Sequence, residues 1–167
     1  MIIIMEFNSK DYKFGLNITQ ELINEALVYI AKSNKNETGG ILIGRYNEER
    51  TCANIKTISG PPNDSKCGPT WFERGIHGLQ ALLSDCWQKK EYYIGEWHFH
   101  PGGSSDPSNR DINQMTDIAR SQKYSCPEPV LFIIGGNAIN YTCKAFVVLR
   151  DRKVIDLNRS EQILKLK

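Results

Sequence analysis

Apolar residues recur at intervals of three and four along two stretches of this chain. The first covers about residues 19–33, and the second ends at about residue 90, with Ile76 and Trp87 among the residues expected to face inward. Such spacing places apolar side chains on one face of a helix, so each stretch predicts an amphipathic helix. A third helix is predicted over residues 109–121, directly after Ser108, because serine is a favoured residue at a helix N-cap.

Short apolar and β-branched runs between these helices predict strands. Polar turns or segments rich in glycine and proline separate the runs, and the longest such segment, residues 60–69, predicts a loop. About seven strands and three helices follow, in a mixed order typical of an α/β or α+β protein with a mostly antiparallel sheet flanked by helices. The expected strands are residues 1–5, 41–46, 52–59, 92–100, 130–134, 139–141 and 145–149, with a short one starting at Thr70.

Composition narrows the class of protein. The chain has 167 residues, 40% of them hydrophobic and 24% charged, which predicts one globular domain over residues 1–167. The net charge is +2 with no block of Lys or Arg, which argues against a nucleic-acid or membrane surface. The opening apolar run is too short for a secretory signal. Five widely spaced cysteines without a Cys-x-x-Cys pair fit neither a disulfide framework nor a zinc finger and indicate reduced, cytoplasmic thiols.

Residues 92–111 hold the residues best suited to chemistry. His98 and His100 lie two apart in a predicted strand, so both imidazoles point to the same face, and Trp97 and Phe99 point to the opposite, apolar face. Asp111 follows at the start of the next helix, and a short loop can bring all three side chains together. Two imidazoles and one carboxylate suit Zn²⁺ and leave a fourth position for water, as in catalytic zinc sites. The residues alone also allow a structural explanation, because Ser-x-x-Asp before a helix is a common capping arrangement.

The spacing His-x-His-Pro, six residues, then Ser-x-x-Asp resembles the signature of the JAMM metalloproteases, also called MPN+ or JAB domains. That family also uses a glutamate just before an upstream strand, and Glu37 within residues 36–44 resembles it. The resemblance covers about residues 15–150. It implies a fold layered like that of the cytidine deaminases. One departure is Phe99, where the family more often has Ser or Thr.

The resemblance implies a role for each matching residue. His98, His100 and Asp111 would hold the zinc ion, and Glu37 would be the general base. Ser108 would donate a hydrogen bond to the oxyanion of the reaction. Glu96 also lies two residues from His98 and shares its face, so local geometry would let it ligate the metal or act as base. The family pattern instead makes Glu96 a residue that supports the ligands or faces the substrate.

Within this family, residues 93–98 look like bacterial members encoded beside activating (E1-like) and conjugating (E2-like) enzymes, such as the deconjugating peptidases of CBASS anti-phage operons. That likeness implies a bacterial isopeptidase that cuts after the C-terminal tail of a ubiquitin-like protein or a cGAS-like nucleotidyltransferase. Three alternatives stay open: a DNA-associated RadC-type protein, a non-catalytic MPN scaffold, and a peptidase that processes sulfur-carrier proteins. Near-neutral charge argues against the first, and the intact ligand set argues against the second.

Overall fold

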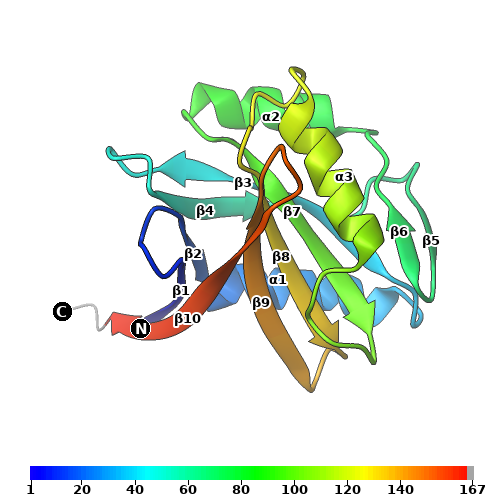
Figure 1. Ribbon diagram of the computed structural model, residues 1–167. Coiled ribbons are helices and arrows are strands. Elements are labelled where there is room, and N and C mark those ends of the chain that lie inside the picture. The colour runs from blue at the N-terminus through cyan, green and yellow to red at the C-terminus, as the bar shows by residue number, and fades with distance from the viewer. Residues whose placement is uncertain (165–167) are drawn as a thin grey trace.

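The computed structural model describes residues 1–164, and a closed barrel of eight strands stands at its centre (Figure 1). Neighbouring strands pair in the order β1-β10-β9-β8-β7-β3-β4-β2, and β2 pairs with β1 to close the ring. The strands of the barrel are β1 (Ile2–Asn8), β2 (Gly15–Thr19), β3 (Thr38–Tyr46), β4 (Cys52–Ile58), β7 (Tyr92–Pro101), β8 (Val130–Gly136), β9 (Tyr141–Val148) and β10 (Val154–Leu164).

Most strand pairs of the barrel are antiparallel, and the two parallel pairs are β2–β4 and β7–β8. The predicted mixed, mostly antiparallel sheet is therefore confirmed. Its closure was not predicted, and it removes the unpaired edges that an open sheet would present. The likeness to the layering of cytidine deaminases stays a prediction.

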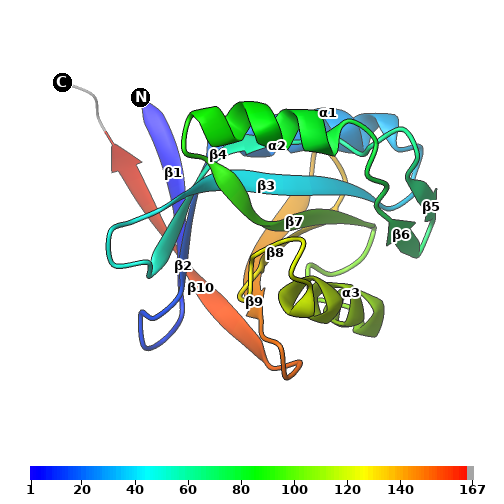
Figure 2. The same ribbon diagram turned by 90° about the horizontal axis from the view of Figure 1, so that it is seen from above.

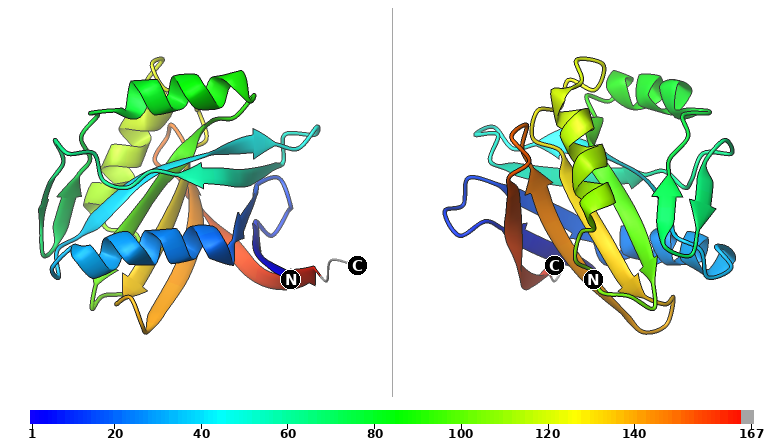
Figure 3. Two further views of the ribbon diagram at one scale, coloured as in Figure 1. Left: turned by 180° about the vertical axis from the view of Figure 1, so that it is seen from behind. Right: turned by 45° about the vertical axis from the view of Figure 1, so that its right-hand side comes forward.

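In the described part of the chain, three helices cover this barrel, as the sequence predicted: α1 (Gln20–Lys32), α2 (Leu79–Gln88) and α3 (Asn109–Arg120). The hydroxyl of Thr19 caps α1 by accepting a hydrogen bond from the backbone N–H of Leu22 at 3.3 Å. Helix α3 lies in front of strands β7 to β9 in Figure 1, whereas α1 lies in front of them when the molecule is seen from behind (Figure 3, left). None of the helices in the described part of the chain has both the length and the apolar character that a membrane span requires.

Two hydrophobic cores result from this arrangement. The first lies among the barrel strands and α1, and it holds Phe7, Trp97 and Phe132. The second lies between α2, α3 and the opposite face of β3, β7, β8 and β9, and it holds Met115 and Ile133. Seen from above, α2 runs beside β3 and α3 lies below β7 (Figure 2). Strand β7 therefore sends alternate side chains into two different environments.

Some expected elements differ from the structure. Helix α2 begins later than predicted, and Ile76 and Trp87, both expected to face inward, are 72% and 65% exposed. The expected loop over residues 60–69 contains β5 (Lys66–Gly68), which pairs with β6 (Trp71–Glu73) in a separate two-stranded sheet. Strand β2 was not predicted, and the two strands expected over residues 139–149 are one, β9.

Candidate active site

Strand β7 separates the two histidines from the barrel core. Trp97 and Phe99 are 1% and 3% exposed in the first hydrophobic core, whereas His98 and His100 point to the other face. This alternation is the one predicted from the sequence. The indole N–H of Trp97 donates to the backbone oxygen of Ser59 on the neighbouring segment at 2.8 Å, which fixes the strand just before His98.

Helix α3 positions the aspartate. The hydroxyl of Ser108 accepts from the backbone N–H of Asp111 at 3.1 Å, and Asp111 Oδ2 accepts from the backbone N–H of Ser108 at 2.8 Å. This reciprocal pair is a capping box, so the structural explanation of the Ser-x-x-Asp spacing is correct. The Ser108 hydroxyl also donates to Asp111 Oδ2 at 2.8 Å. A serine that bonds a substrate oxyanion would have to turn its hydroxyl away from this carboxylate.

The structure brings His98, His100 and Asp111 together. His98 Nδ1 lies 2.9 Å from Asp111 Oδ1, and His100 Nε2 lies 3.1 Å from Asp111 Oδ2. The second contact lacks hydrogen-bond geometry, so His100 Nε2 is a buried nitrogen without a hydrogen-bond partner. A buried imidazole nitrogen that makes no hydrogen bond is free to bind a metal ion.

The three side chains are in contact but are not arranged around a common point as metal ligands would be. Among the described side chains, those of residues 1–160, no three His, Cys, Asp or Glu are arranged as metal ligands. The physical reason lies in Asp111, whose oxygens face the two imidazoles directly, with a hydrogen bond joining Oδ1 to His98 Nδ1. The donor types nonetheless suit zinc, because two imidazoles and the carboxylate that contacts both of them are ligands that zinc prefers.

The pKa of Glu37 depends on the charges of His100 and Asp111. Burial raises the pKa of Glu37, while His100 lowers it and Asp111 raises it further, so its carboxylate lies within their field. Burial alone would raise the pKa of Asp111, but His100 and His98 outweigh it and hold that pKa far below its usual value. The pKa of His100 is raised, because Asp111 and Glu37 outweigh the opposing effect of burial.

Gly39 explains how β3 approaches the histidines so closely. It lies opposite His98 in the β3–β7 pair, and a Cβ atom there would come within 2.3 Å of the Trp97 carbonyl oxygen. The same atom would lie 3.0 Å from both the His98 ring and the Phe72 ring. A side chain at this position would therefore collide with β7, and glycine permits the close backbone approach.

Glu96 forms a buried ion pair with Arg74. It is 3% exposed, and its Oε1 accepts from Arg74 Nε at 2.7 Å. This contact directs the carboxylate toward the segment after β6, although the residue shares the strand face of His98. Burial raises the pKa of Glu96, and Arg74 opposes that shift.

Sequence reasoning missed three residues that contact the site's strand or helix. Phe72 places its ring 5.7 Å from the His98 ring, edge to face, and Gln114 donates to the Phe72 carbonyl oxygen at 3.1 Å. Arg74 is the third. No motif or spacing in the sequence identifies these residues. The one available signal was Glu96 inside an apolar strand, because a buried ionised carboxylate needs a positively charged partner.

Comparison with known proteins gives one family for most of the chain. The model of prokaryotic homologues of the JAB domain matches residues 19–149. A protein of Enterobacter hormaechei subsp. hoffmannii named "CD-NTase/cGAS isopeptidase" is 44% identical over 84% of this chain and 79% of its own length. A protein of the same name from Escherichia coli is 34% identical over 60% of this chain and 62% of its own.

Two further relatives are more distant. "Probable metalloprotease y4qB" of Sinorhizobium fredii is 26% identical over 75% of this chain and 78% of its own length. The solution structure of protein DSY2949 from Desulfitobacterium hafniense matches with a TM-score of 0.62 at 20% identity, covering 89% of this chain and 91% of the other. At that identity the structural match shows a shared fold.

Proposed function

This chain belongs to the family of prokaryotic JAB-domain homologues, and from this premise we propose that it is a zinc-dependent isopeptidase that reverses protein conjugation. Its substrate would be a cGAS-like nucleotidyltransferase joined through its C-terminus to a target amine in a bacterial CBASS anti-phage system. The relative that is 44% identical supports this proposal, since its name is that of an isopeptidase acting on such a protein. The observation that carries it is the convergence of His98, His100 and Asp111 within the matched domain.

His98, His100 and Asp111 would hold the zinc ion. When bound, zinc supplies Lewis acidity and makes a water molecule acidic enough to lose a proton near neutral pH. The buried Nε2 of His100, which makes no hydrogen bond, supports this proposal, as does the fit of the three donor types.

The protein's own residues would carry out the proton transfers. Glu37 would accept a proton from the attacking water and pass it to the leaving amine, and its raised pKa brings it closer to the working range of such a base. Ser108 would donate to the oxyanion when its hydroxyl rotates away from Asp111 Oδ2. Glu96 would support the site from its ion pair with Arg74.

The remaining features belong to the same proposal. We place the protein in the bacterial cytoplasm, as one peptidase domain over residues 1–167, working against E1-like and E2-like conjugating enzymes. We expect neither nucleic-acid nor membrane binding, and we expect the deaminase-like layering of the family. A ubiquitin-like protein is the second substrate that the same chemistry would accept.

A backbone edge beside the site suits an extended tail. Strands β5 and β6 pair with each other and with no third strand in the described part of the chain. The backbone N–H of Glu37 donates to the carbonyl oxygen of Gly68 at 2.9 Å, so this hairpin lies directly beside the proposed base. An extended peptide can add to such an edge by backbone hydrogen bonds.

The experiment that tests this proposal is cleavage of a fusion between the C-terminal tail of a CBASS nucleotidyltransferase and a reporter protein. We expect cleavage at the junction, inhibition by a zinc chelator, and no cleavage when the tail sequence is scrambled. Equal cleavage of the native and scrambled tails would refute the proposed specificity. No cleavage of either by zinc-loaded protein would favour the non-catalytic scaffold.

A further inference from the structure

The hairpin formed by β5 and β6 contacts both elements that carry the proposed zinc ligands. Phe72 of the hairpin packs its ring against His98 of β7, with the planes at 81°. The Arg110 guanidinium of α3 lies 5.2 Å from the centre of the Trp71 ring, also on the hairpin. The side-chain amide of Gln114, on α3, donates a hydrogen bond to the Phe72 carbonyl oxygen. A shift of this hairpin would therefore change the packing around His98.

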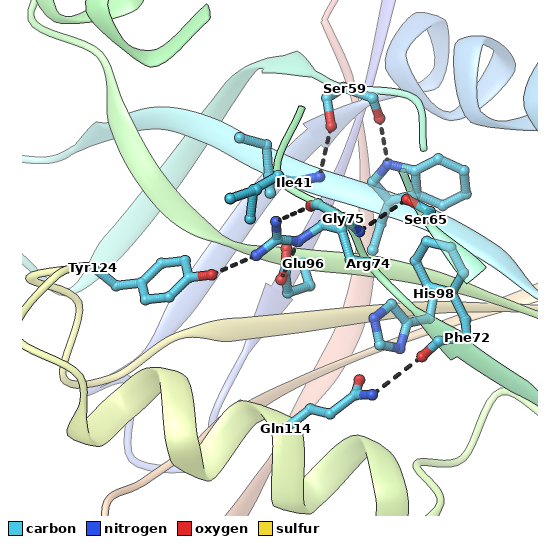
Figure 4. Close-up of polar contacts among 12 residues, drawn as sticks. Ile41, Ser59, Ser65, Phe72, Arg74, Gly75, Glu96, His98, Gln114 and Tyr124 are labelled. Atoms are coloured by element: carbon cyan, nitrogen blue, oxygen red, sulfur yellow. Dashed lines mark hydrogen bonds and ion pairs between the residues drawn. The ribbon is translucent and has the colours of Figure 1, made fainter. Parts of the chain in front are cut away.

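A buried ion pair fixes the end of this hairpin. Arg74 directly follows β6, and its Nε donates to Glu96 Oε1 on β7 at 2.7 Å. The other guanidinium nitrogens donate to the Gly75 carbonyl oxygen at 2.7 Å and to the Tyr124 hydroxyl at 2.6 Å. Figure 4 shows the Arg74 guanidinium between Glu96, Gly75 and Tyr124, near the contact of Phe72 with His98.

The location of this pair indicates a positioning role. The Arg74 and Glu96 side chains are 8% and 4% exposed, so both charges have left water at a substantial free-energy cost. Apolar residues of similar size would fill the same space without that cost, so packing alone does not explain the pair. A planar guanidinium with three directed hydrogen bonds instead fixes the orientation of what it joins. Here it joins the hairpin to β7, two residues before His98.

We propose that Arg74 and Glu96 are positioning residues that hold the β5–β6 hairpin, and with it Phe72, against the His98 imidazole. Their part in the reaction rests on the proposed function. Their effects on the local opening of the hairpin and on zinc binding by His98 do not depend on which substrate is cut. Both effects can therefore be measured separately from catalysis.

The test uses the full chain with the double substitution Arg74→Met/Glu96→Leu, which leaves no unpaired buried charge and so keeps the fold. Three quantities are compared with the wild type: amide hydrogen exchange of residues 66–73, the rate of zinc loss to a chelator, and kcat on the tail fusion. We expect hairpin exchange to rise by at least about tenfold, because local opening no longer breaks the ion pair. We expect severalfold faster zinc loss, because His98 is less well positioned. We expect kcat to fall on the order of 10–100-fold for the same reason.

Tyr124→Phe is the matched control, since it removes one hydrogen bond of Arg74 and leaves the ion pair intact, and it should change all three measurements much less than the double substitution does. Unchanged hairpin exchange in the folded double variant would overturn the proposal. Faster exchange with unchanged zinc loss would overturn it as well, because the hairpin would then not support His98. If the wild type cuts no tail fusion, the proposed function fails, while exchange and zinc loss still decide this proposal.

Discussion

Glu37→Gln is expected to lower kcat by about 10²–10⁴-fold while leaving the fold and the bound metal intact. The amide is nearly the same size as the carboxylate but cannot take a proton from water. The contact that fixes this residue, from its backbone N–H to the Gly68 carbonyl oxygen, does not involve the side chain. We therefore expect an unchanged melting temperature and zinc content beside the loss of rate.

Single-turnover cleavage of the tail fusion measures this effect, with Glu96→Gln as its matched control. Glu96→Gln keeps an oxygen that can accept from Arg74 Nε, so it should retain much more activity than Glu37→Gln. If Glu37→Gln is active and Glu96→Gln is inactive, then Glu96 is the base and the role assigned to Glu37 is wrong.

Loss of metal is the second large effect that we expect. Purified protein should contain about one zinc ion per chain, and His98→Ala should remove most of it, because a three-ligand site that loses one imidazole keeps too few donors. Metal analysis after gel filtration measures the ratio. His77→Ala is the natural control, since His77 is an exposed residue outside the site and should leave the zinc content unchanged.

The same measurement can contradict the assigned ligands. Full zinc occupancy in a His98→Ala/His100→Ala double variant would place the metal elsewhere in the chain. Loss of most of the zinc in His98→Ala, and of all of it in the double variant, would support the assignment.

The sequence allowed the positions of the candidate ligands to be predicted, because short-range geometry determines them. Alternation along a strand placed His98 and His100 on one face, with Trp97 in the core. The capping preference of Ser108 fixed the first turn of α3 and therefore the position of Asp111. Each of these features depends on a few neighbouring residues.

Features that depend on distant segments could not be predicted in this way. Barrel closure requires β1 to pair with β10, and the register of that pair joins residues 2–8 to residues 158–164 near the opposite end of the chain. Helix periodicity alone placed Trp87 inward, whereas in the structure it lies exposed against Tyr92. The partner of Glu96 is an arginine 22 residues earlier, and no local rule identifies it. Long-range contacts of this kind become visible only in the folded chain.

The most direct test of the proposed isopeptidase is the mass of the products released from a complete conjugate. A nucleotidyltransferase joined through its C-terminus to a target amine is incubated with zinc-loaded protein, and the products are weighed by mass spectrometry. We predict a target at its unmodified mass and a nucleotidyltransferase of full length ending in a free carboxylate, both absent when Glu37→Gln replaces the wild type. An intact conjugate after incubation with zinc-loaded wild type, or fragments cut inside either protein, would contradict the proposal.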